Sequence, residues 1–432
     1  MLPCECRSNS LIEGSLNKYP DLPPLAKWKA MLLEYGVTFD NQHLFNDYPG
    51  IELFKTKKRV LNPVSHNLVV TDESRGQSVI PSEVTIHEDG NTSIVKLGFR
   101  EKSPIGIGIS AEGTIIFLDR TTHQQIPLEA KLVKRLGYLD VHMPPEIDAD
   151  EHLLSDVVDI VGLDRLSVIP FDGCWNWNSG HPCKFCDYNP KDENYDTTKA
   201  LTNTLKGFDF DIEKWWDSTK DRYFASLKYG FDYLLKNEDI GPHKHLLIMS
   251  GNLPDPVKVW GIAQSVTDNL NEVKSVSEFD NYLNICPHPN LAILEKAKGS
   301  GIQQVQYNLE VIGEELFKEM CPGKMDYQLF RTKLIEAVKI MGFGKVRSNF
   351  VLGLQEPDEL LEGISELADQ GVVADYSIFQ PKRATPLAKY PAPPMDTIVY
   401  FTQQLVKIYK EHGFNGIYCS VSSRSSIINE CL

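Results

Sequence analysis

The sequence contains no run of 18 apolar residues, so a transmembrane helix is not expected. It does not open with a basic segment followed by an apolar stretch, and we therefore expect no secretory signal. Positive charge is also scarce, because 44 Lys and Arg face 59 Asp and Glu, which gives a formal net charge of -15. This charge repels phosphate backbones and anionic lipids, so we expect neither a nucleic acid nor a membrane as a partner.

The cysteine count is odd, whereas a framework of disulfides needs an even number. The chain has nine cysteines among 432 residues. An odd count without a secretory signal favours metal ligation or free thiols in a reducing cytoplasm over disulfides. Internal repeats and low-complexity segments are also absent from the sequence. Its length suits one or two domains, and its hydrophobic and charged fractions, 42% and 24%, are those of an ordinary globular protein.

Two regions of the chain have different patterns, which predicts two domains, 1–160 and 161–432. The first region has one helical stretch, 25–35, followed by short strand-like runs that are separated by turn-forming residues. We expect an N-terminal α+β accessory domain with a largely antiparallel sheet. Its strands are predicted at 66–71, 78–87, 93–99 and 106–118, before a proline-rich acidic link at 142–156.

In the second region strand-like and helix-like stretches alternate. The predicted strands are 166–171, 245–250, 280–286, 303–308, 346–352 and 375–380. The predicted helices are 212–235, 256–270, 291–297, 327–341, 359–371 and 395–412. Repeated β-then-α units predict a parallel sheet covered by helices. Six units suit a doubly wound sheet as well as a partial (β/α)6 TIM-like barrel. We expect the barrel, in which chemistry gathers at the C-terminal ends of the strands.

Three cysteines follow the first predicted strand of this region. Cys174, Cys183 and Cys186 lie in the stretch FDGCWNWNSGHPCKFCDYNP. Three thiolates can hold a cubane iron–sulfur cluster and leave one iron open for a further ligand. A zinc site of three cysteines and one histidine, completed by His181, is the alternative.

The pair Cys183 and Cys186, with the aromatic Phe185 between them, resembles the end of the cluster motif of the radical S-adenosylmethionine (radical SAM) superfamily. The resemblance implies that the three cysteines bind a [4Fe-4S] cluster, whose open iron chelates SAM. Reduction then cleaves SAM to a 5′-deoxyadenosyl radical. The spacing departs from the usual motif, because eight residues rather than three separate Cys174 from Cys183.

Polar residues or glycines also end the later strands. The second strand ends in Ser250-Gly251-Asn252, the fourth in Asn308-Leu309-Glu310 and the fifth in Val351-Leu352-Gly353. Glu310 offers an anionic acceptor, and Arg331, in the helix that is predicted next, offers a guanidinium donor for a carboxylate.

This order of motifs resembles the lipoyl synthase and biotin synthase branch of the superfamily over residues 165–425. The resemblance implies that SAM is bound by Phe185, Ser250, Gly251, Asn252, Asn308, Glu310, Arg331, Val351 and Gly353.

The same resemblance implies an enzyme that removes hydrogen from a small-molecule substrate, which leads to rearrangement, cleavage or coupling. It also implies a flavodoxin- or ferredoxin-like electron donor, a cytoplasmic location and sensitivity to oxygen. Sulfur insertion from a second, auxiliary iron–sulfur cluster is an alternative, because Arg424-Ser425-Ser426 resembles a cluster-ligating segment of lipoyl synthases. The alternative from another class is a zinc-stabilised binding or scaffold protein.

The C-terminal tail combines an apolar run, 416–421, with the serine-rich segment 422–426. In a mobile tail such apolar side chains would stay exposed to water. We therefore expect an ordered tail that returns over the open end of the barrel, with Cys419 and Arg424 at the active site.

Overall fold

The structure is a computed structural model that describes residues 10–39, 56–59, 78–134, 136–171, 173–189, 205–239, 244–382, 385–415 and 423–432. It contains two compact units. The N-terminal unit comprises Met1–Arg135, Ala392–Gln403 and Ser423–Leu432, and the barrel unit comprises Leu136–Pro391 and Gln404–Ser422. The first unit thus ends at Arg135, whereas a domain boundary near residue 160 stays a prediction from the sequence.

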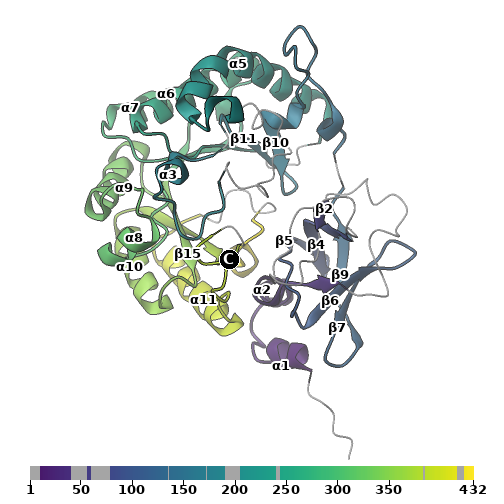
Figure 1. Cartoon of the computed structure of the whole chain (residues 1–432). Coiled ribbons are helices and arrows are strands. Elements are labelled where there is room, and N and C mark those ends of the chain that lie inside the picture. Colours follow the sequence, from purple (N-terminus) through teal and green to yellow (C-terminus); the bar gives the residue numbers. More distant parts are fainter. Residues whose placement is uncertain are drawn as a thin grey trace, which may run out of the picture. The chain divides into compact units, whose positions relative to one another are not determined.

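A seven-stranded sheet forms the interior of the barrel unit (Figure 1). Its strands, in spatial as well as chain order, are β10 (Val158–Val161), β11 (Arg165–Val168), β12 (His245–Met249), β13 (Asp280–Asn284), β14 (Gln304–Gln306), β15 (Val346–Leu352) and β16 (Val372–Ile378). Strand β10 is antiparallel to β11, and all later neighbours are parallel. A doubly wound sheet would reverse its strand order at a switch point, and this sheet does not. The predicted α/β class and partial (β/α)6 barrel are confirmed.

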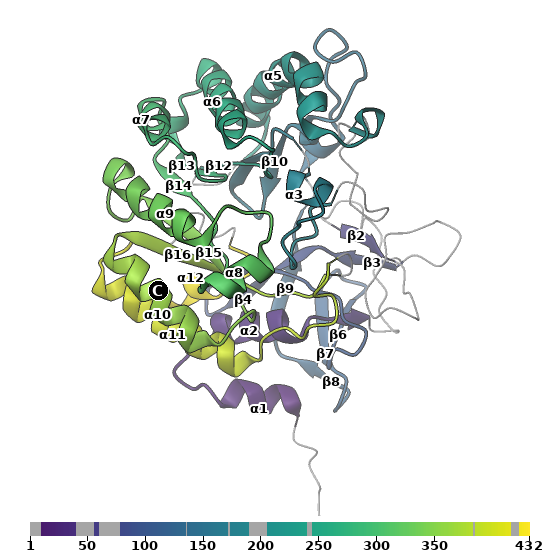
Figure 2. The ribbon, with the colours of Figure 1, turned by 60° about the vertical axis from the view of Figure 1, so that its left-hand side comes forward.

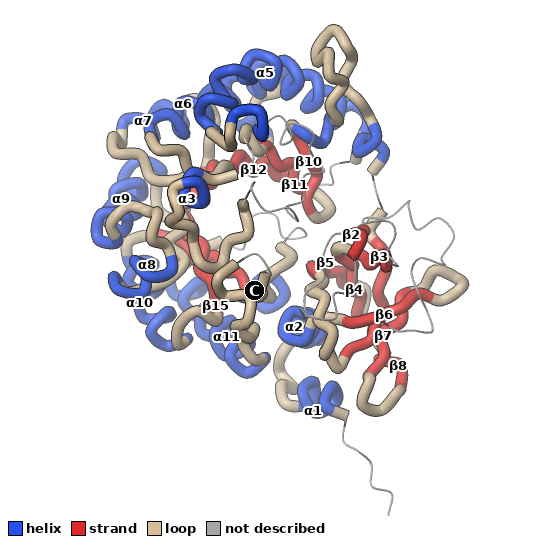
Figure 3. The backbone as a smooth tube through the Cα atoms, in the orientation of Figure 1, coloured by secondary structure: helices blue, strands red, loops and turns tan. Residues whose placement is uncertain are grey.

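Helices cover the outer face of this sheet, and the strands lie inside them (Figure 3). The helices are α5 (Ile212–Asn237), α6 (Pro256–Val273), α7 (Ala292–Gly299), α8 (Glu314–Met320), α9 (Tyr327–Met341), α10 (Pro357–Asp369) and α11 (Met395–Glu411), while the short α3 (Trp175–Asn178) lies in the cysteine loop after β11. Aliphatic side chains seal the interface between the layers, among them Leu246, Leu283, Val305, Leu334 and Ile364, each at most 1% exposed. No helix among the described residues is long and apolar enough to cross a bilayer.

Among the described strands and helices of the barrel unit, β10, α8 and the one-turn helix α3 were not predicted. Strand β10 falls at the end of the expected acidic link, and its residues pair with β11 from Val158↔Val168 to Val161↔Arg165. Helix α8 lies between β14 and α9, in a stretch of seven residues that is too short to show a clear helical period. Because α8 was not expected, α9 is the second helix after β14 and not the first. This changes which residues follow β14 at the site.

The N-terminal unit is an α+β assembly in which α2 packs against β4 and β5 (Figure 2). Its elements are α1 (Leu11–Asn17), α2 (Pro24–Tyr35), β1 (Thr38–Phe39), β2 (Thr56–Arg59), β3 (Ser78–Pro81), β4 (Glu83–Glu88), β5 (Asn91–Lys96), β6 (Ile105–Ile109), β7 (Ile115–Asp119), β8 (Gln124–Ile126), β9 (Glu129–Leu132) and α12 (Ile428–Cys431).

The described strands of this unit form separate sheets of order β1-β6-β7-β8, β5-β4-β9 and β2-β3, not the single sheet that was expected. All of their pairings are antiparallel except that of β1 with β6. The predicted strand at 66–71 lies outside the described residues.

The C-terminal tail packs onto the N-terminal unit through buried charges. The Lys29 ammonium, fully buried in α2, donates to the Glu430 carboxylate at 2.8 Å and to the Ser423 carbonyl at 2.7 Å. The Arg424 guanidinium pairs with the buried Glu83 carboxylate. Glu83 thus neutralises Arg424, and the expected place of Arg424 at the active site stays a prediction. Cys419 and the run 416–421 lie outside the described residues.

Replacing Glu430 by glutamine is expected to destabilise the protein by about 3–5 kcal/mol, because it leaves the buried Lys29 ammonium without a counter-charge. Urea denaturation followed by circular dichroism measures the effect. The matched control is Asp396→Asn, which breaks an ion pair with Lys18 whose two side chains are 57% and 60% exposed and which is worth less than about 1 kcal/mol. Equal midpoint shifts in the two variants would show that Lys29 does not depend on the tail.

Candidate active site

Cys174 is held by the turn that follows the neighbouring strand β12. The Asn252 amide donates to the Cys174 sulfur at 3.3 Å, and the Trp175 amide donates to the Asn252 carbonyl at 2.8 Å. Gly251 lies so close to this loop that an added Cβ would stand 2.1 Å from the Gly173 carbonyl oxygen and 2.9 Å from the Cys174 Cα. Only glycine fits there, so the turn after β12 fixes the position of Cys174.

The other two cysteines are fixed by the segment after α8. The Lys184 amide, next to Cys183, donates to the Met320 carbonyl at 2.9 Å, and the Lys184 ammonium reaches Glu319 at 2.8 Å. An added Cβ at Gly323 would stand 2.5 Å from the His181 carbonyl oxygen, so this backbone also packs directly against the cysteine loop. Although more than 60 positions separate α8 from Asn252 in the turn after β12, both hold the same loop.

Neighbouring groups affect the three thiols differently. A hydrogen bond from Cys321 lowers the pKa of Cys183. Burial raises the pKa of Cys174, although the Asn252 amide partly offsets it. Burial also raises the pKa of Cys186, to about 12. Without a bound metal, Cys183 is therefore the thiol that ionises most readily.

The spread of the three sulfurs distinguishes a cluster from a single ion. Among the described residues, Asp148, Asp150 and His152 form the one set of Cys, His, Asp or Glu ligand atoms that lie within 4.8 Å of one another. At least one pair of the three cysteine sulfurs is therefore more than 4.8 Å apart. Tetrahedral zinc with bonds of about 2.3 Å would bring its sulfurs to within about 3.8 Å of one another. The arrangement fits a polynuclear cluster better than the Cys3His zinc alternative, whose His181 is exposed.

A polar network lies at the ends of the next strands. The Lys324 ammonium donates to the Glu310 carboxylate at 2.8 Å and to the Asn308 carbonyl at 2.6 Å. The Asn308 side chain donates to Asn284 at 3.1 Å and accepts from the Asn349 amide at 3.2 Å. The network therefore connects the carboxyl ends of β13, β14 and β15, where a barrel binds its ligands.

Glu310 has a backbone conformation that few side chains adopt. Its φ is +73°, and it bridges β14 and β15 through hydrogen bonds with the Asn349 carbonyl and the Val351 amide. Burial alone would lower the pKa of Lys324, but the charges of Glu310, Cys321 and Cys183 outweigh it and raise that pKa. The ammonium is thus held in its charged form beside both the carboxylate and the thiols.

Arg331 is not part of this network. Its guanidinium pairs with Glu366 of α10 at 2.8 Å and lies over the ring of Tyr327. Because α8 intervenes, Arg331 is on the second helix after β14, and the cation that pairs with Glu310 is Lys324. That Arg331 binds SAM stays a prediction. Neither Lys324 nor Cys321 was predicted. The signal that could have found them is the Cys-Pro-Gly-Lys turn directly after a short helix.

The remaining predicted residues also lie at the strand ends. The Ser250 hydroxyl is buried and has no hydrogen-bond partner among the described residues, so it is free for a ligand. Val351 is 6% exposed, Gly353 has a φ of +106°, and Phe185 is half-buried. The structure thus places Ser250, Val351 and Gly353 where they were expected, while their roles stay predictions.

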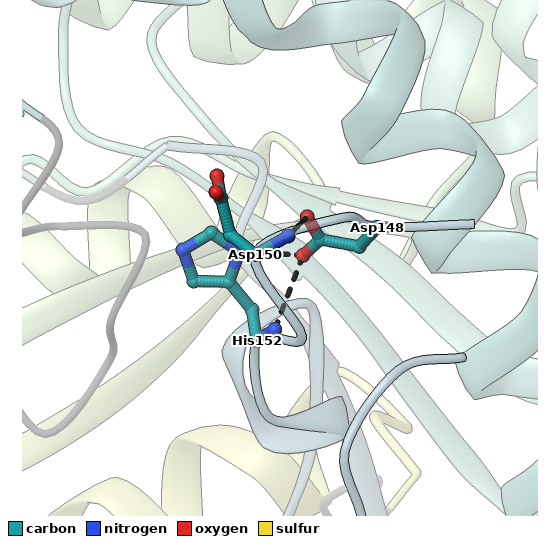
Figure 4. A group of neighbouring side chains, drawn as sticks. All are labelled: Asp148, Asp150 and His152. Carbon is teal, nitrogen blue, oxygen red and sulfur yellow. Dashed lines mark hydrogen bonds and ion pairs between the residues drawn. The ribbon is translucent and has the colours of Figure 1, made fainter. Parts of the chain in front are cut away.

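Asp148, Asp150 and His152, in the acidic link between the two regions, lie close together (Figure 4). Asp148 accepts from the Asp150 and His152 amides at 3.2 and 3.3 Å. Arg222 of α5 forms ion pairs with Asp148 and Asp150, and the His152 ring also hydrogen-bonds Asp148. The guanidinium supplies the positive charge that a cation would, so these residues form an ion-pair network that ties the link to α5.

Known proteins match this chain over part of its length. No family model matches the chain. Over 248 residues it is 27% identical to the bacteriochlorophyllide c C-7(1)-hydroxylase of Chlorobaculum limnaeum. The match covers 55% of this chain and 57% of that relative's length.

Among solved structures the chain is similar to the FeFe-hydrogenase maturase HydG from Carboxydothermus hydrogenoformans, with 16% identity, 60% of this chain and 54% of that chain covered, and a TM-score of 0.38. It is also similar to the coproporphyrinogen III oxidase HemN from Escherichia coli, a radical SAM enzyme, with 12% identity, coverages of 59% and 54%, and a TM-score of 0.35.

Over about half of its length, the chain is thus similar to a hydroxylase and to a radical SAM enzyme. Radical SAM proteins use a [4Fe-4S] cluster and SAM. The buried Glu310–Lys324 pair, and the Ser250 hydroxyl that has no hydrogen-bond partner among the described residues, could contact a ligand with both ammonium and carboxylate groups.

Replacing Gly251 by alanine is expected to remove most of the cluster, because the new Cβ cannot share its position with backbone atoms of Gly173 and Cys174. Iron and sulfide content after anaerobic reconstitution measures the loss. Gly261→Ala is the matched control, since nothing lies within 4 Å of a Cβ at that exposed position of α6. A Gly251→Ala protein with full iron content would contradict the role of this turn.

Proposed function

We propose that this protein is a radical SAM enzyme that cleaves SAM reductively and uses the product to remove hydrogen from a small-molecule substrate. One observation carries the proposal: three cysteines follow strand β11, and a buried carboxylate–ammonium pair, Glu310 with Lys324, follows strand β14 of the same parallel sheet. When bound, the cluster and SAM supply the electron transfer and the hydrogen-abstracting chemistry.

The chain's own groups would bind and orient these cofactors. Cys174, Cys183 and Cys186 would ligate the cluster, and the Asn252 amide would stabilise the Cys174 thiolate through its hydrogen bond. Glu310 would accept from the ammonium or ribose hydroxyls of SAM, and Lys324 would donate to its carboxylate. Ser250, whose hydroxyl lacks a partner in the described part of the chain, would complete the contacts to the amino acid moiety.

The strand ends would also shape the rest of the SAM site. The small and apolar positions Val351 and Gly353 would lie against the adenine, where a flat base needs close backbone approach. The buried sheet interior would keep water away from the reacting atoms. Arg331 stays a second candidate for the SAM carboxylate, and a comparison with Lys324 decides between them.

A hydroxylase among the relatives supports removal of hydrogen from carbon as the chemistry of this chain. Because the match spans 57% of that relative, the substrate of this chain is proposed only as a small organic molecule with an abstractable C–H hydrogen. A flavodoxin- or ferredoxin-like protein is the proposed electron donor. Sulfur insertion from an auxiliary cluster stays the alternative, and the Arg424 of its proposed ligand segment is paired with Glu83.

Anaerobic reconstitution with iron and sulfide, followed by incubation with SAM and dithionite, tests this function. Formation of 5′-deoxyadenosine is expected even without substrate, because reductive cleavage needs only the cluster, SAM and an electron. Candidate substrates that carry deuterium at the reacting carbon should transfer it to 5′-deoxyadenosine. A reconstituted protein with four irons per chain that forms no 5′-deoxyadenosine would refute the proposal.

A further inference from the structure

Asn349 of β15 contacts the Glu310 carboxylate, and the proposed function gives it no role. Its side-chain nitrogen donates to Glu310 Oε2 at 3.5 Å, whereas the Lys324 ammonium donates to Oε1 at 2.8 Å. The two carboxylate oxygens thus have partners from different elements, β15 and the turn after α8. A distance of 3.5 Å is long for a hydrogen bond, so this contact orients the carboxylate more than it binds it.

Strand β15 also fixes the backbone that carries Glu310. The Glu310 amide donates to the Asn349 carbonyl at 3.0 Å, and the preceding Leu309 amide donates to the Ser348 hydroxyl at 2.9 Å. The side chain of Asn308 accepts from the Asn349 amide at 3.2 Å. Three successive residues are therefore held, which maintains the unusual φ of +73° at Glu310. With this backbone fixed, the orientation of the carboxylate depends on its side-chain partners.

Ser377 of β16 anchors the other end of the Asn349 side chain. An ionised carboxylate only accepts hydrogen bonds, so the nitrogen of the Asn349 carboxamide faces Glu310. The carboxamide oxygen then faces Ser377, whose hydroxyl donates to it at 3.1 Å. The hydrogen bonds therefore run in one direction across the strand ends, from Ser377 through Asn349 to Glu310.

We propose that Asn349 positions the Glu310 carboxylate for SAM and that Ser377 anchors Asn349 for this purpose. The inference deepens the proposed function and rests on it, because it requires Glu310 to accept from the ammonium or a ribose hydroxyl of SAM. A carboxylate that already has the orientation of the complex loses less rotational freedom on binding. Asn349 thus increases the affinity for SAM through Glu310, as a positioning residue and not as a SAM ligand.

Equilibrium binding of SAM to the reconstituted protein tests this role. Asn349→Ala removes the donor and should raise the dissociation constant roughly three- to tenfold, as for the loss of one hydrogen bond. Ser377→Ala should act in the same direction with a smaller effect, and Ser377→Thr, which keeps the hydroxyl, should lose less than Ser377→Ala. Gln328→Ala is the matched control. It removes an exposed 3.3 Å hydrogen bond from a carboxamide to the Glu314 carboxylate and should leave the affinity unchanged.

A double-mutant cycle separates positioning from a direct or purely structural role. The Glu310→Ala background has no carboxylate to position, so adding Asn349→Ala there should change the affinity for SAM by less than about twofold. A residue that bound SAM itself, or that only supported the fold, would cost a similar factor in both backgrounds.

Two outcomes would overturn the inference: wild-type affinity in Asn349→Ala, or equal losses in the two backgrounds. If the alanine variant does not fold, Asn349→Leu replaces it as a non-donor of similar size. Failure of the proposed function is a separate result. The wild-type protein with its cluster would then form no 5′-deoxyadenosine from SAM and dithionite, whereas failure of this inference leaves that activity intact.

Discussion

Alanine in place of Cys174, Cys183 or Cys186 is expected to abolish both cluster binding and the formation of 5′-deoxyadenosine. Each thiolate would hold one iron, and a cubane that loses one of three protein ligands exposes a second iron to solvent and exchange. Cys174 is the most informative position, because eight residues separate it from Cys183. Its place in the site depends on the turn after β12 and not on a short motif.

Iron and sulfide content, the visible absorption spectrum and 5′-deoxyadenosine measure the loss in each variant. Cys431→Ala is the matched control, since this thiol lies in α12 of the N-terminal unit, and it should keep full iron content. If Cys174→Ala kept full iron content and activity, the widely spaced triad would be wrong. The cluster would then need a different third ligand.

A comparably large effect is expected at Lys324. Replacing it by methionine removes the counter-charge of the buried Glu310 carboxylate and the cation nearest the thiols. Loss of one partner from such a pair costs on the order of 2–5 kcal/mol, so the affinity for SAM should fall at least about 30-fold. The iron content should fall less, because the cysteines keep their own contacts with the turn after β12 and with α8.

Equilibrium binding of SAM to the reconstituted protein measures this effect, and urea denaturation separates it from lost stability. The double variant Lys324→Met, Glu310→Gln restores neutrality, so it should regain stability but not SAM affinity. Arg331→Ala is the comparison that the structure offers. Its partner Glu366 is 57% exposed, and breaking that pair is worth less than about 1 kcal/mol. If Arg331→Ala weakened SAM binding more than Lys324→Met, the sequence-based assignment of Arg331 would hold instead.

The barrel was predictable because its strands and helices carry strong local patterns. Strand β15 and helix α9 have the predicted bounds, Val346–Leu352 and Tyr327–Met341, since each is a continuous apolar or periodic stretch with clear ends. The order of the units then fixed which residues follow which strand. The positions of Cys174, Ser250 and Glu310 at the strand ends followed from that order alone.

The partners of the charged residues could not be predicted in the same way. Helix α8 is only seven residues long, so Arg331 was assigned to the first helix after β14 although it belongs to the second. Lys324 lies in a turn without periodicity, 14 positions from the carboxylate that it meets. In the N-terminal unit, the buried Lys29 contacts Glu430, about 400 positions away, and no local pattern indicates such a pair.

The most direct test of the account is the electron paramagnetic resonance (EPR) spectrum of the anaerobically reconstituted, dithionite-reduced protein, recorded with and without SAM and accompanied by metal analysis. We predict four irons and four sulfides per chain, a signal of one reduced [4Fe-4S] cluster, and a change of that signal when SAM binds. A colourless protein with one zinc per chain and no such signal would contradict the account. It would favour the zinc-stabilised alternative.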